Sequence, residues 1–221
     1  MADQKEIMNI IAFHGWACDS DDWKAWKEVL PFEYTFELWD RGYFGKKREI
    51  TRTDIDIVIT HSMGLLQVPE TILSQTKVLI ALHPFAFFPS TEHELAERVV
   101  QQIHQMIKNM TVRPSDQIHF FRRQAGLVDR SFEHDHLDIP LLIADLKRLK
   151  TEMINFDLIR SIPRVLWVHE DQDSIIPIQS RLELEKEFPD HNHFLEGRGS
   201  HSYCLRNPET IISRLFRNES N

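Results

Sequence analysis

A serine at the end of a short apolar run carries the clearest chemical signal in this chain. Residues 57–59 are Ile-Val-Ile, and residues 60–64 read T-H-S-M-G, with Ser62 at the centre. Such a run suits a buried parallel strand, and S-x-G directly after one is typical of a nucleophile elbow. The sharp turn of an elbow exposes the serine hydroxyl and points the next backbone N–H, that of Met63, into the same space. The G-x-S-x-G pattern is incomplete here, because Thr60 replaces the first glycine.

A histidine and two aspartates near the C-terminus could complete an acyl-transfer site with Ser62. A serine hydroxyl becomes a nucleophile when a histidine takes its proton, and a buried carboxylate must hold that histidine in the correct tautomer. The base is predicted to be His201, in a G-R-G-S-H loop. The acid follows the strand expected at residues 164–168, where both Asp171 and Asp173 stand.

The H-G-W loop after the first predicted strand, residues 7–13, supplies a fourth part. The backbone N–H of Trp16 and that of Met63 are predicted to form an oxyanion hole, which stabilises the charge on a tetrahedral intermediate. His14 and His61 lie next to these groups in the sequence. We expect these two histidines to orient loops rather than to exchange protons.

Strand-like segments alternate with helical ones through most of the chain, which predicts a mainly parallel sheet flanked by helices. The predicted strands are residues 7–13, 34–39, 55–59, 77–82, 164–168 and 193–195. Ligands of such sheets bind at the carboxyl ends of the strands, where Ser62, Asp173 and His201 are all expected. Only about 14 residues separate the second and third strands, near the minimum for a parallel crossover, so the helix there must be short or missing.

Residues 85–156 have no strand pattern and instead predict three helices. Apolar residues recur every three or four positions along them, as in Val99, Ile103 and Ile107. Because the segment lies between two predicted strands, we expect a helical cap inserted into a core that is formed by residues 1–84 and 157–221.

Composition limits the classes of function. The chain has 221 residues, 42% of them hydrophobic, which is enough for one core. A formal net charge of −8 argues against general nucleic-acid binding. No apolar run approaches the roughly 18 residues that a membrane span needs. The N-terminal residues do not have the pattern of an export signal. Cys18 and Cys204 are too few for a disulfide framework, so a soluble protein of the reducing cytoplasm is expected.

Five motifs together resemble those of α/β-hydrolases. They are H-G-W at residues 14–16, D-R-G-Y-F-G at 40–45, H-S-M-G at 61–64, D-x-x-x-P at 173–177 and G-x-G-S-H at 197–201. The chain order Ser62, Asp173, His201 is also the order of this superfamily. Asp173 stands four residues before Pro177, and this spacing resembles the family pattern better than that of Asp171.

Within the superfamily, the H-G-W and D-R-G-Y-F-G stretches are similar to the pimeloyl-[acyl-carrier protein] methyl ester esterases of biotin synthesis, the BioH-like and BioK-like enzymes. The chain departs from the family pattern at Thr60, at Leu65 and in the short crossover of residues 41–54. The resemblance implies an α/β-hydrolase fold and a serine carboxylesterase that needs no cofactor and no metal. Its substrate would be the methyl ester of pimeloyl-acyl carrier protein, with small-molecule esters as further substrates.

Four side chains are predicted to contact that substrate. Trp16 and Phe85 follow strand ends and are expected to line an acyl channel. Arg122 and Arg123 lie in residues 98–130, a segment with six basic and two acidic residues, which could dock an acidic carrier protein or could simply be a solvated helix surface. The basic residues are Arg98, Lys108, Arg113, Arg122, Arg123 and Arg130.

Two other classes of function stay open. A thioesterase or a broad short-chain esterase would use the same triad with a different pocket, and a non-catalytic hydrolase homologue would bind a ligand or a partner. The histidine pairs at residues 134/136 and 191/193 could be ligands of a metal site. Without cysteine or carboxylate partners at zinc spacing, we interpret them as exposed loop histidines.

Overall fold

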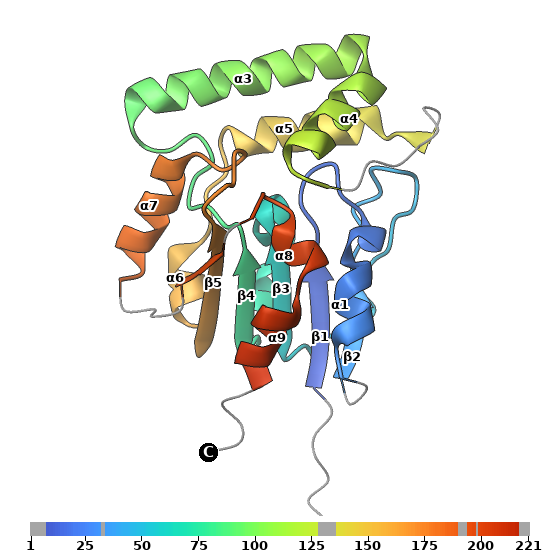
Figure 1. Ribbon diagram of the computed structural model, residues 1–221, viewed down its shortest axis with the longest axis vertical. Helices are drawn as coiled ribbons and strands as arrows, with labels where there is room; N and C mark the ends of the chain where they lie inside the picture. Colours follow the sequence, from blue (N-terminus) through green and yellow to red (C-terminus); the bar gives the residue numbers. More distant parts are fainter. Residues whose placement is uncertain (1–7, 32–33, 128–135, 190–193, 198, 217–221) are drawn as a thin grey trace, which may run out of the picture.

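The computed structural model describes residues 8–31, 34–127, 136–189, 194–197 and 199–216. A central sheet stands upright in Figure 1, with helices on both of its faces and three longer helices across its upper end. That upper end is where the carboxyl ends of the strands lie (Figure 1). Among the described residues, none of the helices is both long enough and apolar enough to cross a membrane.

The sheet has six strands in the order β2-β1-β3-β4-β5-β6, and every neighbouring pair is parallel. The strands are β1 (Met8–Phe13), β2 (Tyr34–Leu38), β3 (Ile57–His61), β4 (Val78–Leu82), β5 (Arg164–Glu170) and β6 (Phe194–Gly197). The central strands β1, β3, β4 and β5 are almost continuously apolar and buried, because helices cover both of their faces. The predicted mainly parallel α/β architecture is confirmed.

Alternate residues of the strands pack into two separate hydrophobic cores, one on each face of the sheet. Ile57 and Ile59 pack on the face that also buries Trp23, Trp26 and Leu205. The helical segments on this face are η1 (Ser20–Trp23), α1 (Lys24–Val29), α8 (Tyr203–Arg206) and α9 (Glu209–Phe216). The opposite face packs against η2 (Ser62–Gln67), α2 (Glu70–Leu73), α6 (Phe156–Arg160) and α7 (Ile178–Glu187).

The three upper helices form the cap and come from the insertion between β4 and β5. They are α3 (His93–Val112), α4 (Pro114–Gln124) and α5 (Ile139–Leu149). Pro114 and Pro140 occupy the first turns of α4 and α5, where a missing N–H costs nothing. The apolar stripes of the three helices meet in a third core, which includes Ile103, Ile118 and Leu146. All three helices lie within residues 85–156.

The crossover from β2 to β3 contains no helix in residues 41–56, all of which are described. An isolated bridge between Asp40 and Arg48 closes this loop instead. Asp40 also accepts hydrogen bonds from the backbone N–H groups of Ser20 (2.9 Å) and Gly42 (2.9 Å). Gly42 has φ +96°, a conformation that glycine adopts without a Cβ penalty. The first residues of the D-R-G-Y-F-G motif thus tie two loops together at the upper end of the sheet.

Core loops hold the cap through α5. Asp145 on α5 is fully buried and accepts hydrogen bonds from Arg41 Nε (2.9 Å), Tyr43 Oη (2.7 Å) and Arg148 Nη1 (3.1 Å). Burial would raise the pKa of Asp145, but the bonds from Arg41 and Tyr43 outweigh it and hold the pKa below its usual value. Trp16 Nε1 donates to the carbonyl oxygen of Leu142 at 2.9 Å.

A second attachment holds α4. Arg122 is 0% exposed, and its guanidinium donates to the carbonyl oxygen of Ala17 (2.8 Å) and to both carboxylate oxygens of Asp22 (2.9 and 3.2 Å). A buried guanidinium needs such a bidentate partner, because an unpaired charge in this position would be strongly destabilising. The cap is therefore joined to the core by buried polar contacts as well as by apolar packing.

Candidate active site

Ser62 stands at a sharp turn directly after β3. Its φ is +53°, a left-handed conformation that costs a non-glycine residue about 1–3 kcal/mol and that is typical of functional turns. Two glycines make the turn possible by close packing. A Cβ on Gly64 would overlap the carbonyl oxygen of Phe13, and a Cβ on Gly15 would lie 3.0 Å from Ser62 Cβ. The H-G-W loop and the serine turn are thus pressed against each other.

Asp173 and His201 are joined by a short hydrogen bond. His201 Nδ1 lies 2.8 Å from Asp173 Oδ2, although 28 residues separate them in the chain. The other carboxylate oxygen, Oδ1, accepts the backbone N–H groups of Ile175 (2.8 Å) and Ile176 (3.2 Å). Asp171, the alternative acid, is exposed. The structure therefore pairs His201 with Asp173.

The pairing fixes the protonation states of the two groups. Burial would raise the pKa of Asp173, but the nearby His201 and hydrogen bonds from His201 and His83 hold it far below its usual range. A carboxylate can only accept, so His201 carries its proton on Nδ1. Its Nε2 is buried and has no hydrogen-bond partner among the described residues. That nitrogen is left with a lone pair for accepting a proton.

His61, the residue before the serine, connects the turn to the histidine loop. Its Nε2 lies 2.9 Å from the carbonyl oxygen of His201, and the two rings lie 4.7 Å apart. Burial, together with the neighbouring histidines His201 and His83, lowers the pKa of His61 well below its usual value. A neutral His61 with its proton on Nε2 can donate to that carbonyl, so it orients the loop as expected.

Glu170 and the end of α4 support the loop of His201. Glu170 accepts hydrogen bonds from the backbone of Gly199 and from Cys204 Sγ at 3.1 Å. On the cap side, the N–H of Ser202 donates to the carbonyl oxygen of Ala125 at 2.9 Å. A Cβ on Gly126 would overlap Ser200, so the cap approaches this loop as closely as a glycine permits.

The two residues predicted to supply the oxyanion hole both adjoin Ser62. Met63 is the second residue of η2, and the first amides of a helix have no acceptor within it. Trp16 follows Gly15, which packs on Ser62. His14 holds this loop, because its Nδ1 lies 2.9 Å from the carbonyl oxygen of Gly15 while its Nε2 accepts the N–H of Arg41 at 2.9 Å.

A cavity of about 400 Å³ lies between this site and the cap. Its lining has no charged side chain among the described residues. At the site end it is lined by Trp16, Ser62 and Met63. The rest of the lining includes apolar side chains (Phe88, Val99, Ile103, Met106, Phe120, Phe121, Leu146, Leu149, Ile175) and amide side chains (Gln102, Gln105, Asn109, Gln117, Gln124).

Two predicted substrate contacts are corrected. Phe85 is buried in the cap core and packs edge-on to Phe88 at 5.2 Å, and it is Phe88 that lines the cavity. Arg122 cannot dock a carrier, because its side chain is fully buried against Asp22. Arg123, one residue later, is exposed and lines a second depression.

One group of described residues has the atom types that a metal ion could bind. Ligand atoms of His83, Asp173 and His201 all lie within 4.8 Å of one another. Both histidines donate Nδ1–H to the carboxylate here, so a metal ion would have to displace two protons. Of the histidine pairs, His134, His191 and His193 lie outside the described residues. His83 was missed as a site residue, although its position directly after a central parallel strand is the same signal that marks the other members.

Comparisons with known proteins agree on the fold. No protein-family model and no curated protein matches the sequence. Solved structures do match. The match to a bromoperoxidase from Bacillus anthracis (15% identity, TM-score 0.72) covers 97% of this chain and 92% of the bromoperoxidase chain. The enol-lactonase from Burkholderia xenovorans LB400 (11% identity, TM-score 0.71) covers 99% and 94%, and the esterase EaEST from Exiguobacterium antarcticum (12% identity, TM-score 0.70) covers 97% and 92%. The chain thus has the α/β-hydrolase fold.

Proposed function

We propose that the protein is a serine carboxylesterase in which Ser62 is the nucleophile, His201 the base and Asp173 the acid that orients it. The observation that carries this proposal is the short bond from His201 Nδ1 to Asp173, which leaves the buried Nε2 without a partner among the described residues. The left-handed turn of Ser62 directly after β3 supports it. A ligand-binding protein would have no need of this arrangement.

The reaction follows from these roles. Ser62 Oγ attacks the ester carbonyl while His201 Nε2 takes its proton, and the N–H groups of Trp16 and Met63 stabilise the resulting oxyanion. His201 then gives the proton to the leaving alcohol, which leaves an acyl group on Ser62. A water molecule, deprotonated by His201, attacks this acyl-enzyme, and His201 returns the proton to Ser62 Oγ as the carboxylic acid leaves. Asp173 stays ionised throughout and stabilises the imidazolium that forms twice in each cycle.

We further propose that the substrate is the methyl ester of pimeloyl-acyl carrier protein. The uncharged cavity suits an aliphatic acyl chain, and its amide side chains suit the amide groups of the carrier's prosthetic arm. Gln105, Asn109 and Gln117 are linked by hydrogen bonds of 2.8 Å. These three residues also line the second depression, which has a volume of about 610 Å³.

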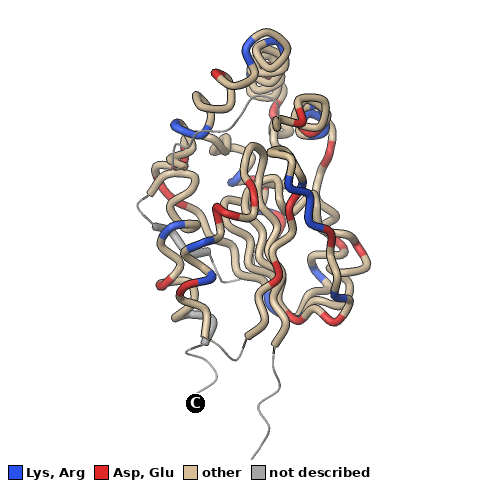
Figure 2. Tube along the Cα trace, turned by 90° about the vertical axis from the view of Figure 1, so that its right-hand side faces the viewer, with Lys and Arg blue, Asp and Glu red and all other residues tan. Residues whose placement is uncertain are grey.

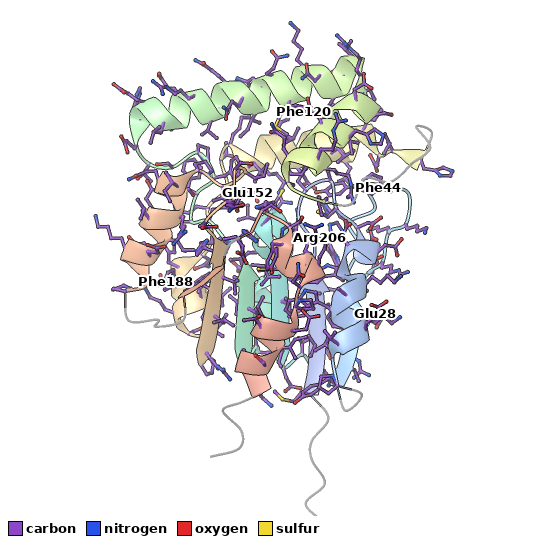
Figure 3. All side chains as sticks on the ribbon, viewed as in Figure 1. Glu28, Phe44, Phe120, Glu152, Phe188 and Arg206 are labelled. Carbon is purple, nitrogen blue, oxygen red and sulfur yellow. The ribbon has the colours of Figure 1, made fainter. Side chains whose placement is uncertain are left out.

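The second depression would receive the acidic carrier. Phe120, labelled in Figure 3 between α3 and α4, lines both hollows. Lys108, Arg113 and Arg123 line the outer one, with Asp116 as its acidic residue. Figure 2 marks basic positions in blue at the top of the molecule, where the cap helices lie. This excess of basic groups favours an anionic partner even though the whole chain is acidic.

Charge reversal tests the docking surface. Replacing both Lys108 and Arg123 with glutamate should raise KM for a carrier-linked ester about 10-fold at low ionic strength and less at high salt, because exposed charges act mainly on encounter. Hydrolysis of a small soluble ester should stay as it is in the unaltered protein. Lys186→Glu, an exposed reversal on α7 away from the cap, is the matched control. Equal loss on both substrates would indicate a damaged cap instead.

The substrate itself is tested by incubating the protein with pimeloyl-carrier-protein methyl ester and weighing the products by mass spectrometry. We expect loss of the methyl group with the thioester to the carrier intact. Release of the whole acyl chain from the carrier would identify a thioesterase. Turnover of short soluble esters alone would identify a broad esterase, and either result would replace the proposed substrate.

A further inference from the structure

A second histidine reaches the carboxylate of the proposed triad. His83 directly follows β4, is fully buried and has φ +51°. A left-handed histidine is uncommon, and such strain persists only where the surrounding structure holds it. Its backbone N–H donates to the carbonyl oxygen of Val168 on β5 at 2.7 Å. The end of β4 is thus fixed in a conformation that sends the His83 ring toward the site.

His83 and His201 share one oxygen atom. His83 Nδ1 lies 2.8 Å from Asp173 Oδ2, the same atom that accepts His201 Nδ1 at 2.8 Å. The two rings lie 4.9 Å apart. Since the carboxylate can only accept, both histidines hold a proton on Nδ1. With the two amides on Oδ1, Asp173 accepts four hydrogen bonds and cannot rotate without losing several of them.

The surroundings keep His83 neutral. Burial lowers its pKa, and although the bond to Asp173 raises it, the nearby His201 lowers it again. One carboxylate cannot balance two buried imidazolium ions, so His201 alone can become charged during the reaction. The titratable or charged groups that face His83 from the surrounding elements are His61, His169, Asp173, Arg181 and His201.

We propose that His83 is a positioning residue of the triad: by donating to the same Asp173 oxygen as His201, it holds the carboxylate in place and limits the negative charge that His201 experiences. This inference rests on the proposed function, because it assigns His201 the role of base. Removing the His83 donor should leave Oδ2 to His201 alone, which strengthens their bond and stabilises the imidazolium. His83 therefore extends the working range of the base toward lower pH.

Two matched variants separate donation from mere filling of space. His83→Phe keeps a ring and removes the donor. His83→Asn keeps an N–H near the position of Nδ1, and asparagine tolerates a left-handed backbone. We expect the acidic limb of the kcat/KM profile for a p-nitrophenyl ester to move up by about one pH unit in His83→Phe, and to stay within a few tenths of a unit in His83→Asn. A role in packing alone would change stability or kcat but would not move the limb.

Nitrogen-15 NMR of labelled histidines supplies a readout besides activity. The Nδ1–H signal of His201, assigned with a His201→Gln variant, should move downfield in His83→Phe, because the bond from His201 Nδ1 to Asp173 Oδ2 strengthens. An unchanged His201 Nδ1–H signal in His83→Phe, or a displacement of equal size in His83→Asn, would overturn the proposal. Failure of the proposed function would look different: the unaltered protein would neither hydrolyse esters nor react with a fluorophosphonate, while the NMR shift would still be measurable.

Discussion

Replacing Ser62 with alanine is expected to lower kcat for a p-nitrophenyl ester by about 10⁴-fold or more, with little change in KM. The variant keeps the cavity and the oxyanion amides but has no atom that can form the acyl-enzyme. Alanine also loses nothing that holds the turn together, because the close packing of the turn comes from Gly15 and Gly64. Steady-state kinetics on the purified variant measure the effect, and its thermal unfolding midpoint should stay within a few degrees of the original.

The control for this experiment is Ser161→Ala, an exposed serine at the end of α6. It should keep full activity. Labelling the unaltered protein with a fluorophosphonate and mapping the peptides by mass spectrometry should place the adduct on Ser62. An adduct on another serine, with Ser62 unmodified, would remove Ser62 from the mechanism.

Asp173→Asn should reduce kcat by about 10⁴-fold while leaving the protein folded. Asparagine keeps the shape of the side chain, but its NH₂ group donates where the carboxylate accepted. His201 and His83 would then compete for one amide oxygen, and His201 would no longer be held with its lone pair on Nε2. The imidazolium that forms in the reaction would also lose the negative charge beside it.

Asp171→Asn is the matched control, because Asp171 is exposed two residues away in the same loop. Its kinetics should be unaltered. Near-normal turnover by the Asp173 variant together with an inactive Asp171 variant would exchange the two roles.

The pH dependence of folding gives a second check on Asp173. Since the folded pKa of Asp173 lies far below its unfolded value, the carboxylate stabilises the fold above about pH 4, and this contribution disappears as the pH falls. Asp173→Asn should therefore flatten the acid side of the stability curve.

The sheet and the serine turn could be predicted because both depend on local sequence. Apolar runs of about five residues that alternate with helical segments are typical of buried parallel strands. The missing crossover helix between β2 and β3 followed from chain length alone, since too few residues remained for it. Asp173 was favoured by its spacing from Pro177, and the structure pairs it with His201.

The errors have a physical cause as well. Arg122 and Arg123 are adjacent on α4 and therefore project about 100° apart, so one faces the core and the other faces solvent. Which one is inside depends on Asp22, whose position 100 residues earlier gives no local signal. The shared contact of His83 was invisible for the same reason, because it depends on the folding of three loops onto one carboxylate oxygen.

The positions of the buried attachments of the cap have a consequence for how the cavity below it can change. The buried polar attachments use side chains or backbone of α4 and α5, through Arg122, Leu142 and Asp145. Much of the cavity wall comes from α3, at Val99, Ile103 and Met106. Under the proposed function, mutations on α3 can therefore resize the cavity for longer or shorter acyl chains while the cap stays anchored. A directed-evolution library for chain-length selectivity belongs on α3, and the two anchoring helices should be left constant.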